Sequence, residues 1–509
     1  MLRNMKAGTD TGRTKRDVLN ALNFGARVAE EEKEGLADYF VETDQWKKVV
    51  SGDVDVVFGP KGSGKSAIYT SLMNRDRAFA DDGILLITAE KPRGSTVFRS
   101  LVADPPTGEV EFVSIWKLYI LSMLGSVIAD YGMVGEDADR VRHALYQEGL
   151  LDASEAPLAS RFQAVWDWIK RAIPRLSPQG ELKLDPVTGN PTGIAFKISL
   201  QEPSNEQRSN GFMSLDDLLR AANDALEFNE LRVWVLFDRL DVAFAESRDL
   251  EANGIRALFK TYLDMRDLEQ VGMKIFLRSD IWDEVTRSGF REASHITRQM
   301  RIEWGSASLL NLVVRRVVRI GEVTEFYRVA PADIIRDAAA QRDFFDSLVP
   351  DQVDVGRNPA TFEWILGRVQ DGSKRSAPRE VIHLLTEARD AQLRMLDRGE
   401  AEPPSMDLLS RAAFRESLLP VSTTRLEQTL YAEYPTEKPW IQALEGERTE
   451  HTITSLAEIW HVPEADAGSR AQRLVEIGFI EERGDRDAPT FWVPFLYRSA
   501  LNLRQGAAG

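Results

Sequence analysis

Four residues near the start of the chain have the types and the spacing of a phosphate-binding loop. Gly59, Gly64, Lys65 and Ser66 fit the pattern G-x-x-x-x-G-K-[ST]. Glycines let backbone N–H groups surround phosphate oxygens, and the N-terminus of a following helix adds partial positive charge. Lys65 would then reach the β- and γ-phosphates of a nucleotide, and the Ser66 hydroxyl would bind Mg²⁺. The alternative interpretation, a glycine-rich turn without a ligand, is disfavoured by the complete pattern.

The segments on either side of this loop support the same interpretation. The apolar run 54–58 precedes the loop as a buried strand would, and apolar residues at helical spacing follow it. We therefore expect the whole loop to surround the nucleotide. Its candidate binding residues are Gly59, Pro60, Lys61, Gly62, Ser63, Gly64, Lys65, Ser66 and Ala67.

A second acidic element, which could hold Mg²⁺, follows another apolar run. Residues 233–237 have the pattern of a strand that ends at Asp238, and Asp241 stands three residues later. An aspartate at the carboxyl end of a central parallel strand lies beside the phosphate-binding loop. Because the basic Arg239 cannot be a general base, Asp241 is the candidate base and Glu90 is the next. For Asp241 the alternative is a solvated acidic turn.

Composition limits the other classes of protein. The 509 residues suggest about three domains. With 64 basic and 80 acidic residues, the formal net charge of −16 disfavours a whole-molecule nucleic-acid binder. The absence of cysteine excludes disulfides and thiolate metal sites, and it favours the reducing cytoplasm. We expect no signal peptide and no membrane span, because the apolar stretch Leu118–Ala129 is shorter than the ~20 residues that a span needs.

Together these motifs resemble the STAND-like and ORC-like branch of the AAA+ superfamily of P-loop ATPases. The resemblance rests on "DRLD" at 238–241 and on an arginine after the next predicted strand. The segment "FGARVAEEEKEGLADYF", which leads toward "GPKGSGKSAI", is also similar to a group of bacterial P-loop ATPases. The resemblance covers roughly residues 20–395. It implies an α/β fold with a parallel-sheet core and a helical lid, and it implies ATP and Mg²⁺ as cofactors.

The resemblance also gives roles to two arginines. In this class, the predicted strand 273–277 lies between the two strands described above, so Arg278 at its exit would sense the γ-phosphate. Arg379 begins a predicted lid helix and would contact the γ-phosphate when the lid closes. The alternatives are an exposed ion pair of Arg278 with Asp280 and a plain surface position for Arg379.

The remaining chain divides by composition and pattern. About 140 residues separate the predicted strand 84–88 from the strand at 233–237, which is far more than one connection requires. This insertion would hold helices around Trp116 and over 162–173, and a β-hairpin within 181–200. The predicted parts are an N-terminal mobile or helical segment (1–45), an ATPase core (46–300) with the insertion (about 92–228), a helical lid (301–396), a linker (397–433) and a winged-helix domain (434–509).

The winged helix is predicted from element order. Three short helical segments are followed by two strands around a Gly/Asp turn, and Ser455 and Glu458 have capping-box spacing in the second helix. From residue 441 onward the chain has 11 acidic residues, 7 arginines and no lysine, which disfavours DNA binding. The predicted recognition helix has only Arg470 and Arg473 as cations. Apolar bulk suited to another protein surface comes from Trp492, Phe495 and Tyr497.

Two functions follow from these patterns. The first is a slow, regulated ATPase switch whose nucleotide state controls domain packing or homo-oligomerisation and thereby a partner effector protein; a setting in bacterial antiviral defence rests on the resemblance alone. The second is a DNA-remodelling or DNA-loading ATPase that uses the winged helix. ATP is favoured over GTP because the chain has no N-K-x-D motif. A small-molecule kinase is the weakest alternative, since such kinases are usually much shorter.

Overall fold

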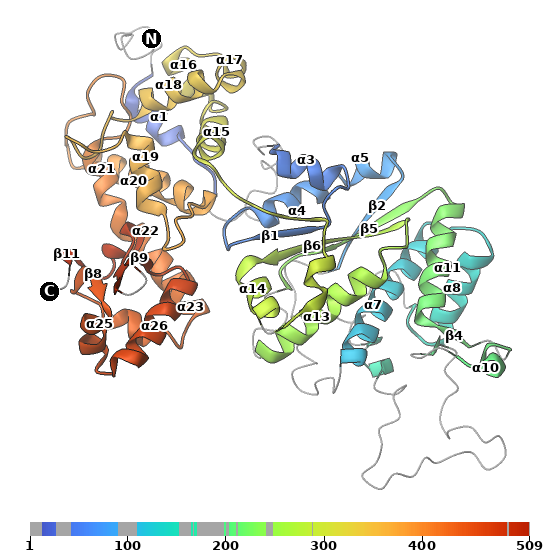
Figure 1. The fold of residues 1–509 in the computed structure, drawn as a ribbon. Coiled ribbons are helices and arrows are strands. Elements are labelled where there is room, and N and C mark those ends of the chain that lie inside the picture. Colours follow the sequence, from blue (N-terminus) through green and yellow to red (C-terminus); the bar gives the residue numbers. More distant parts are fainter. Residues whose placement is uncertain are drawn as a thin grey trace. The chain divides into compact units, whose positions relative to one another are not determined.

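The computed structural model divides into two compact units (Figure 1). Unit 1 comprises Met1–Thr43, Lys61–Ala67 and Glu303–Gly509, and unit 2 comprises Asp44–Pro60 and Ile68–Ile302. The glycine-rich loop therefore groups with unit 1, whereas the strand before it belongs to unit 2. The structure describes residues 13–26, 42–89, 109–151, 164–165, 167–169, 198–199, 203–209, 212–240, 248–287, 289–485 and 488–507.

Unit 2 is built on a five-stranded parallel sheet. Its strand order is β2-β5-β6-β1-β7, and every neighbouring pair is parallel. The first four of these strands in the order are mainly apolar runs, as expected for parallel strands covered on both faces, whereas the edge strand β7 is polar and largely exposed. The order places β6, which ends at Arg278, between β5 and β1, as the family resemblance implied. The strands are β1 (Val56–Gly59), β2 (Ile84–Thr88), β5 (Arg232–Phe237), β6 (Val271–Arg278) and β7 (Gln299–Arg301).

Helices of unit 2 cover this sheet and extend beyond it into a helical bundle. Helices α7, α8 and α11 pack on one another in the insertion, and α13 packs on α7 (Figure 1). The helices of unit 2 are α3 (Asp44–Val50), α4 (Lys65–Met73, whose first three residues group with unit 1), α5 (Asp76–Asp81), α7 (Glu109–Asp130), α8 (Glu136–Gln147), α10 (Asn205–Ser209), α11 (Leu215–Phe228), α13 (Arg248–Asp264), α14 (Ser279–Arg287) and the 3₁₀ helix η3 (Arg291–His295).

Helix α7 carries the most apolar stretch of the chain. In the described part of the chain, Glu111–Asp130 is the one helical stretch long and apolar enough to cross a membrane. However, 78% of that window is buried inside the structure, as in the core helix of a soluble protein. The stretch Leu118–Ala129 thus forms a buried helix, as expected from the sequence.

Most of the predicted β-hairpin in the insertion lies outside the described residues. Ile198 and Ser199 are described, and they form β3 (Ile198–Ser199). This short strand pairs in parallel with β4 (Met213–Ser214). Of the predicted helix at 162–173, residues 164–165 and 167–169 are described, and they are helical.

Unit 1 begins with a short helix that is tied into its core. Helix α1 (Lys15–Ala21) packs against α16 and α20, and it buries Val18 and Leu19 completely. Thr14 caps this helix through its side chain. The helices after residue 303 are α15 (Ser306–Val317), α16 (Gly321–Tyr327), α17 (Pro331–Arg336), α18 (Ala338–Leu348), α19 (Thr361–Val369) and α20 (Pro378–Asp397).

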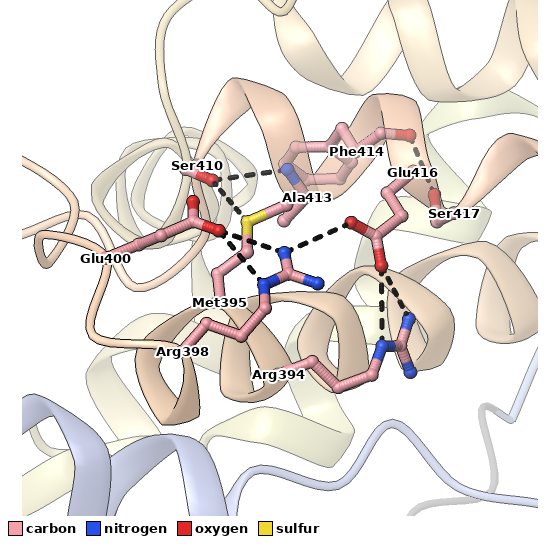
Figure 2. Close-up of polar contacts among 9 residues, drawn as sticks. All are labelled: Arg394, Met395, Arg398, Glu400, Ser410, Ala413, Phe414, Glu416 and Ser417. Carbon is pink, nitrogen blue, oxygen red and sulfur yellow. Dashed lines mark hydrogen bonds and ion pairs between the residues drawn. The ribbon is translucent and has the colours of Figure 1, made fainter.

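The segment predicted as a linker, 397–433, is largely helical and packed within unit 1. Its Glu416 carboxylate pairs with Arg394 at 3.1 Å and with Arg398 at 3.9 Å, which fixes α21 against α20 (Figure 2). The Ser410 hydroxyl caps α21 by accepting from the Ala413 amide. Two prolines and a run of charges therefore mark a turn here and not an extended connection. The elements are α21 (Arg411–Glu416), α22 (Leu418–Arg425), the π-helix η4 (Leu426–Leu430) and α23 (Tyr431–Glu433).

The last part of unit 1 contains a four-stranded sheet of order β11-β8-β10-β9. Helices α25 and α26 pack on each other, and β9 and β10 form an antiparallel pair. This element order is that of a winged helix, which remains our interpretation of residues 434–509. The elements are α24 (Lys438–Gln442), β8 (Arg448–Thr452), α25 (Ile453–Trp460), α26 (Glu464–Glu476), β9 (Glu481–Asp485), β10 (Ala488–Trp492), α27 (Phe495–Arg498) and β11 (Arg504–Ala507).

The predicted capping box of α25 is wrong by one turn. The N-cap is Thr452, whose hydroxyl accepts from the Ser455 amide at 3.2 Å, while Ser455 Oγ accepts from the Thr452 amide at 2.9 Å. Ser455 therefore closes the box as its third helical residue, and Glu458 takes no part in it. The chain is already extended at Thr452, so the helix starts earlier than the Ser/Glu spacing indicates.

Candidate nucleotide-binding site

The loop after β1 has the backbone shape that phosphate binding requires. Gly62 and Gly64 have φ angles of +80° and +97°, and a residue with a side chain would be strained in this backbone conformation. The Ser63 side chain is 2% exposed, and its hydroxyl has no hydrogen-bond partner among the described residues. Helix α4 then begins at Lys65, so Lys65 and Ser66 lie in its first turn, where backbone N–H groups attract anions. The residues present therefore fit a bound nucleotide phosphate.

Three side chains from later parts of unit 1 contact this loop at successive positions. The Trp304 indole N–H donates to the Ser63 carbonyl at 2.7 Å. Arg379 lies against Gly62, since a Cβ built on that glycine would be 3.2 Å from Arg379 Cβ. Lys61 Nζ pairs with Glu433 Oε1 at 2.5 Å. The sequence analysis named Arg379 but missed the other two contacts.

Trp304 and Glu433 carried no local signal that could have identified them. Trp304 stands just after β7, and Glu433 ends a three-residue helix about 370 positions beyond the loop. Neither belongs to a motif or to a periodic pattern. Only the packing of unit 1 places them on the loop.

In unit 2, the carboxyl ends of β1, β5 and β6 lie at one edge of the sheet, because these strands are parallel. Asp238 follows β5 directly and is buried. The chain then turns sharply: Arg239 has a φ of +59° and is exposed, and Leu240 is buried again. This turn keeps the Arg239 side chain out of the core. The two candidate bases, Asp241 and Glu90, lie outside the described residues.

Arg278 is placed at the same edge by strand register. Its Cα is paired with that of Gly59 across β6 and β1, so it stands where the glycine-rich loop begins. Its guanidinium binds the Asp280 carboxylate at two points, at 3.1 Å from Nε and 2.6 Å from Nη2. The ion pair that the sequence analysis gave as the alternative is therefore formed in this structure. A sensor role for Arg278 remains a prediction.

A buried charged cluster at the opposite end of β1 fixes this register. Lys274 of β6 is 2% exposed, and its ammonium donates to the Val54 carbonyl at 2.8 Å and to Asp55 at 2.9 Å. Tyr262 and Arg298 bind the other oxygen of the Asp55 carboxylate. Burial lowers the pKa of Lys274, and Asp55 opposes that effect. Burial, with Asp55 beside it, raises the pKa of Tyr262.

This cluster was also missed, although the sequence held a signal. Lys274 is the one charge inside the apolar run 271–277, and Asp55 interrupts the apolar residues before the loop. Charged residues inside buried strands are almost always paired. Two opposite charges inside the apolar runs of two neighbouring strands are therefore expected to pair with each other.

No cluster of three or more His, Cys, Asp or Glu side chains suited to a metal ion occurs among the described residues. Ser66 and Asp238 remain the candidate ligands.

Arginines and aromatic rings alternate on the C-terminal part of unit 1. The guanidinium of Arg498 lies 4.4 Å from the ring centre of Trp492 and 4.0 Å from that of Phe495. Arg483 lies 3.8 Å from Trp492, and Arg368 of α19 lies 3.8 Å from Phe495. We call these five residues the arginine–aromatic stack. Burial, followed by the charges of Arg368 and Arg483, lowers the pKa of Arg498 to about 10.

The predicted recognition helix α26 is less basic than its sequence suggests. Arg473 binds Glu437 at 2.8 Å and Glu476 at 3.1 Å, so its charge is neutralised locally. Arg470 lies over the Trp440 ring, 5.1 Å from its centre. Tyr497 is fully buried and contributes to the core, not to a surface.

The strand order of unit 2, with the glycine-rich loop directly after β1, defines an α/β P-loop NTPase fold. No family model matches the sequence, and no curated protein matches it.

Solved structures similar to the chain include two proteins of Aeropyrum pernix. ORC1 in complex with DNA is 11% identical with a TM-score of 0.36, over 96% of this chain and 97% of that one. ORC2 with ADPNP and ADP is 12% identical with a TM-score of 0.29, over 96% and 99%. At such low identity and TM-score, the likeness says nothing about what this chain binds.

Proposed function

We propose that this chain is an ATP-binding switch that hydrolyses ATP slowly and passes its nucleotide state to the helical elements of unit 1. The observation that supports it is the set of three contacts on consecutive loop positions. Glu433, Arg379 and Trp304 reach Lys61, Gly62 and the Ser63 carbonyl, respectively. A loop that changes its conformation when phosphates bind would move all three. In nucleotide switches, contacts of this kind let a bound γ-phosphate change the order or the position of a neighbouring segment.

Each site residue has a separate task in this proposal. Lys65 would neutralise the β- and γ-phosphates, and Ser66 and Asp238 would hold Mg²⁺, which when bound would supply further positive charge at the phosphates. Asp241, or Glu90 in its place, orients and deprotonates the attacking water. Arg278 and Arg379 contact the γ-phosphate, so each would exchange its present neighbour for the nucleotide.

In this proposal, the switch controls the assembly of this chain into a homo-oligomer and thereby the activity of a partner protein. We infer that ATP favours a homo-oligomer that binds an effector protein in the cytoplasm, and that ADP favours a smaller particle. The parts 46–300, 301–396 and 434–509 serve as ATPase core, lid and winged helix in this scheme. A defence setting has only the family resemblance behind it.

Particle size tests this output directly. Light scattering on purified protein with ADP, and with a non-hydrolysable ATP analogue, should give different masses. Lys65→Ala should give the ADP value under both conditions because it cannot hold the phosphates. Equal masses for the wild-type protein in both nucleotides would contradict the switch, provided that both nucleotides bind.

Nucleic-acid binding is the second candidate function, and the arginine–aromatic stack favours it. The segment after residue 441 is acidic overall, but the fold gathers Arg368, Arg483 and Arg498 around two aromatic rings. Arg368 and Arg483 also pair with Asp354 at 3.3 Å and Glu481 at 2.8 Å, so phosphates would have to compete with these carboxylates. Arginine clusters beside aromatic rings are typical of surfaces that bind phosphate backbones. Titration with duplex and single-stranded DNA at near-physiological salt tests this candidate. Sub-micromolar affinity that Arg483→Gln weakens and Arg470→Gln spares would support it.

A further inference from the structure

The first lysine of the glycine-rich loop is held by a carboxylate from a distant part of the chain. Lys61 Nζ and Glu433 Oε1 are 2.5 Å apart, and that oxygen is closed off from solvent. The Glu433 side chain is 13% exposed and that of Lys61 is 36% exposed. Fully exposed ion pairs contribute little, but this one is formed by a mostly buried acid.

This arrangement is the opposite of what phosphate binding requires. A nucleotide triphosphate is drawn to a loop by backbone N–H groups and by free cations. Glu433 cancels one of those cations and adds a negative charge at the edge of the loop. The same carboxylate therefore stabilises the loop without nucleotide and opposes the approach of phosphates.

The local fold of the acid supports a role beyond packing. Glu433 ends α23, which continues directly from the π-helix η4 (Leu426–Leu430). π-Helical turns are rare, and they are frequently found at functional sites. Because a π-turn contains more residues than an α-turn, η4 rotates the residues that follow it, including Glu433, about the helix axis.

We propose that Glu433 sets the affinity of the glycine-rich loop for nucleotide phosphates by occupying Lys61 when no nucleotide is bound. Nucleotide binding then separates the two side chains, and α23 is released from the loop. This inference rests on the proposed function, since it assumes that the loop takes a nucleotide. It adds Glu433 as a residue that controls the affinity of the loop, and it adds α23 as the element that responds to nucleotide binding.

The test is the affinity of the full-length protein for ATP and Mg²⁺, measured by calorimetry on point variants. Glu433→Gln removes the negative charge and keeps the shape, so it should bind about tenfold more tightly. Lys61→Met should bind more weakly than the wild type because it leaves the carboxylate uncompensated. The double variant loses one charge of each sign and should return to within about twofold of the wild-type value.

Glu427→Gln is the matched control, because Glu427 is an exposed acid in η4, six residues before Glu433. It should leave affinity unchanged. If Glu433→Gln binds as the wild type does, or more weakly, the proposal is wrong. If the wild-type protein itself binds no nucleotide, the proposed function fails instead, so the two failures are distinguishable. Circular dichroism identifies any variant that does not fold; if Glu433→Gln is one of them, Lys61→Met becomes the test, and wild-type affinity in that variant would contradict the proposal.

Discussion

The indole N–H of Trp304 donates a hydrogen bond to the carbonyl of Ser63, in the middle of the glycine-rich loop, at 2.7 Å. Trp304 is the second residue of the long C-terminal segment of unit 1, which begins at Glu303. The bond therefore ties the shape of the loop to the residue at which the chain enters the helical part of unit 1.

Removing this bond should weaken nucleotide binding. Trp304→Phe keeps one aromatic ring and loses the donor together with part of the indole, and we expect about a three- to tenfold loss of ATP affinity, from a hydrogen bond worth about 1 kcal/mol. Calorimetry measures it. Trp460→Phe is the matched control, because Trp460 also donates its indole N–H to a backbone carbonyl, that of Trp440. Equal affinity losses in both variants would mean that Trp304 acts only through general stability.

The buried Lys274 of β6, which binds the residues just before β1, should be essential for stability. Lys274→Met removes one partner of the Asp55 carboxylate and leaves it with Tyr262 and Arg298, and we expect about 3 kcal/mol of lost stability in urea unfolding, the usual scale for breaking a buried pair. Lys48→Met breaks the exposed pair with Asp44 and should cost less than about 0.5 kcal/mol. A small effect at Lys274 would show that the cluster does not fix the β1–β6 register.

Asp238 and Asp241 should separate metal binding from water activation. Asp238→Ala should weaken Mg²⁺-dependent nucleotide binding, because it removes a buried carboxylate next to β5. Asp241→Asn should leave binding intact and lower turnover by about 10²–10⁴, the usual range for a lost general base. Full turnover in Asp241→Asn would remove that residue from the mechanism, and Glu90→Gln would then be the next variant to assay.

His451 predicts a pH dependence of stability in the C-terminal sheet. Burial lowers its pKa in the folded state, although the Arg448 backbone and Glu447 oppose this. Between that lowered pKa and the ordinary value of about 6.5, the unfolded chain binds more protons than the folded chain. Stability should therefore be fully present above about pH 6.5 and fall as the pH drops below it. Hydrogen exchange of β8 amides measures this fall, which should be smaller in His451→Leu.

The elements that position the loop could be predicted because their signals are local. The run Ile84–Thr88 was predicted to the residue, and the strands around Asp238 and Arg278 to within two residues at each end. Apolar runs of that length that end at a glycine or a charged residue are most simply interpreted as buried strands. The order of the strands came from the resemblance, not from the pattern.

The contacts on the loop could not be predicted because they join residues far apart in the sequence. Nothing near Glu433 marks it as a partner of Lys61, and nothing near Trp304 marks it as a donor to Ser63. The arginine–aromatic stack could not be predicted for the same reason: the acidic C-terminal segment supplies Arg483 and Arg498, and the distant helix α19 supplies Arg368. The sequence pattern predicts the helices and strands, whereas tertiary packing determines which charged side chains come into contact.

The most direct test of the central claim is ATP binding by the wild-type protein and by Lys65→Ala, measured by calorimetry in the presence of Mg²⁺. Lys65 is the cation placed in the first turn of α4 against the β- and γ-phosphates. We predict saturable binding by the wild-type protein and no measurable binding by the variant, with unchanged circular dichroism spectra. Equal affinity in the two proteins would contradict the assignment of this loop as a nucleotide site.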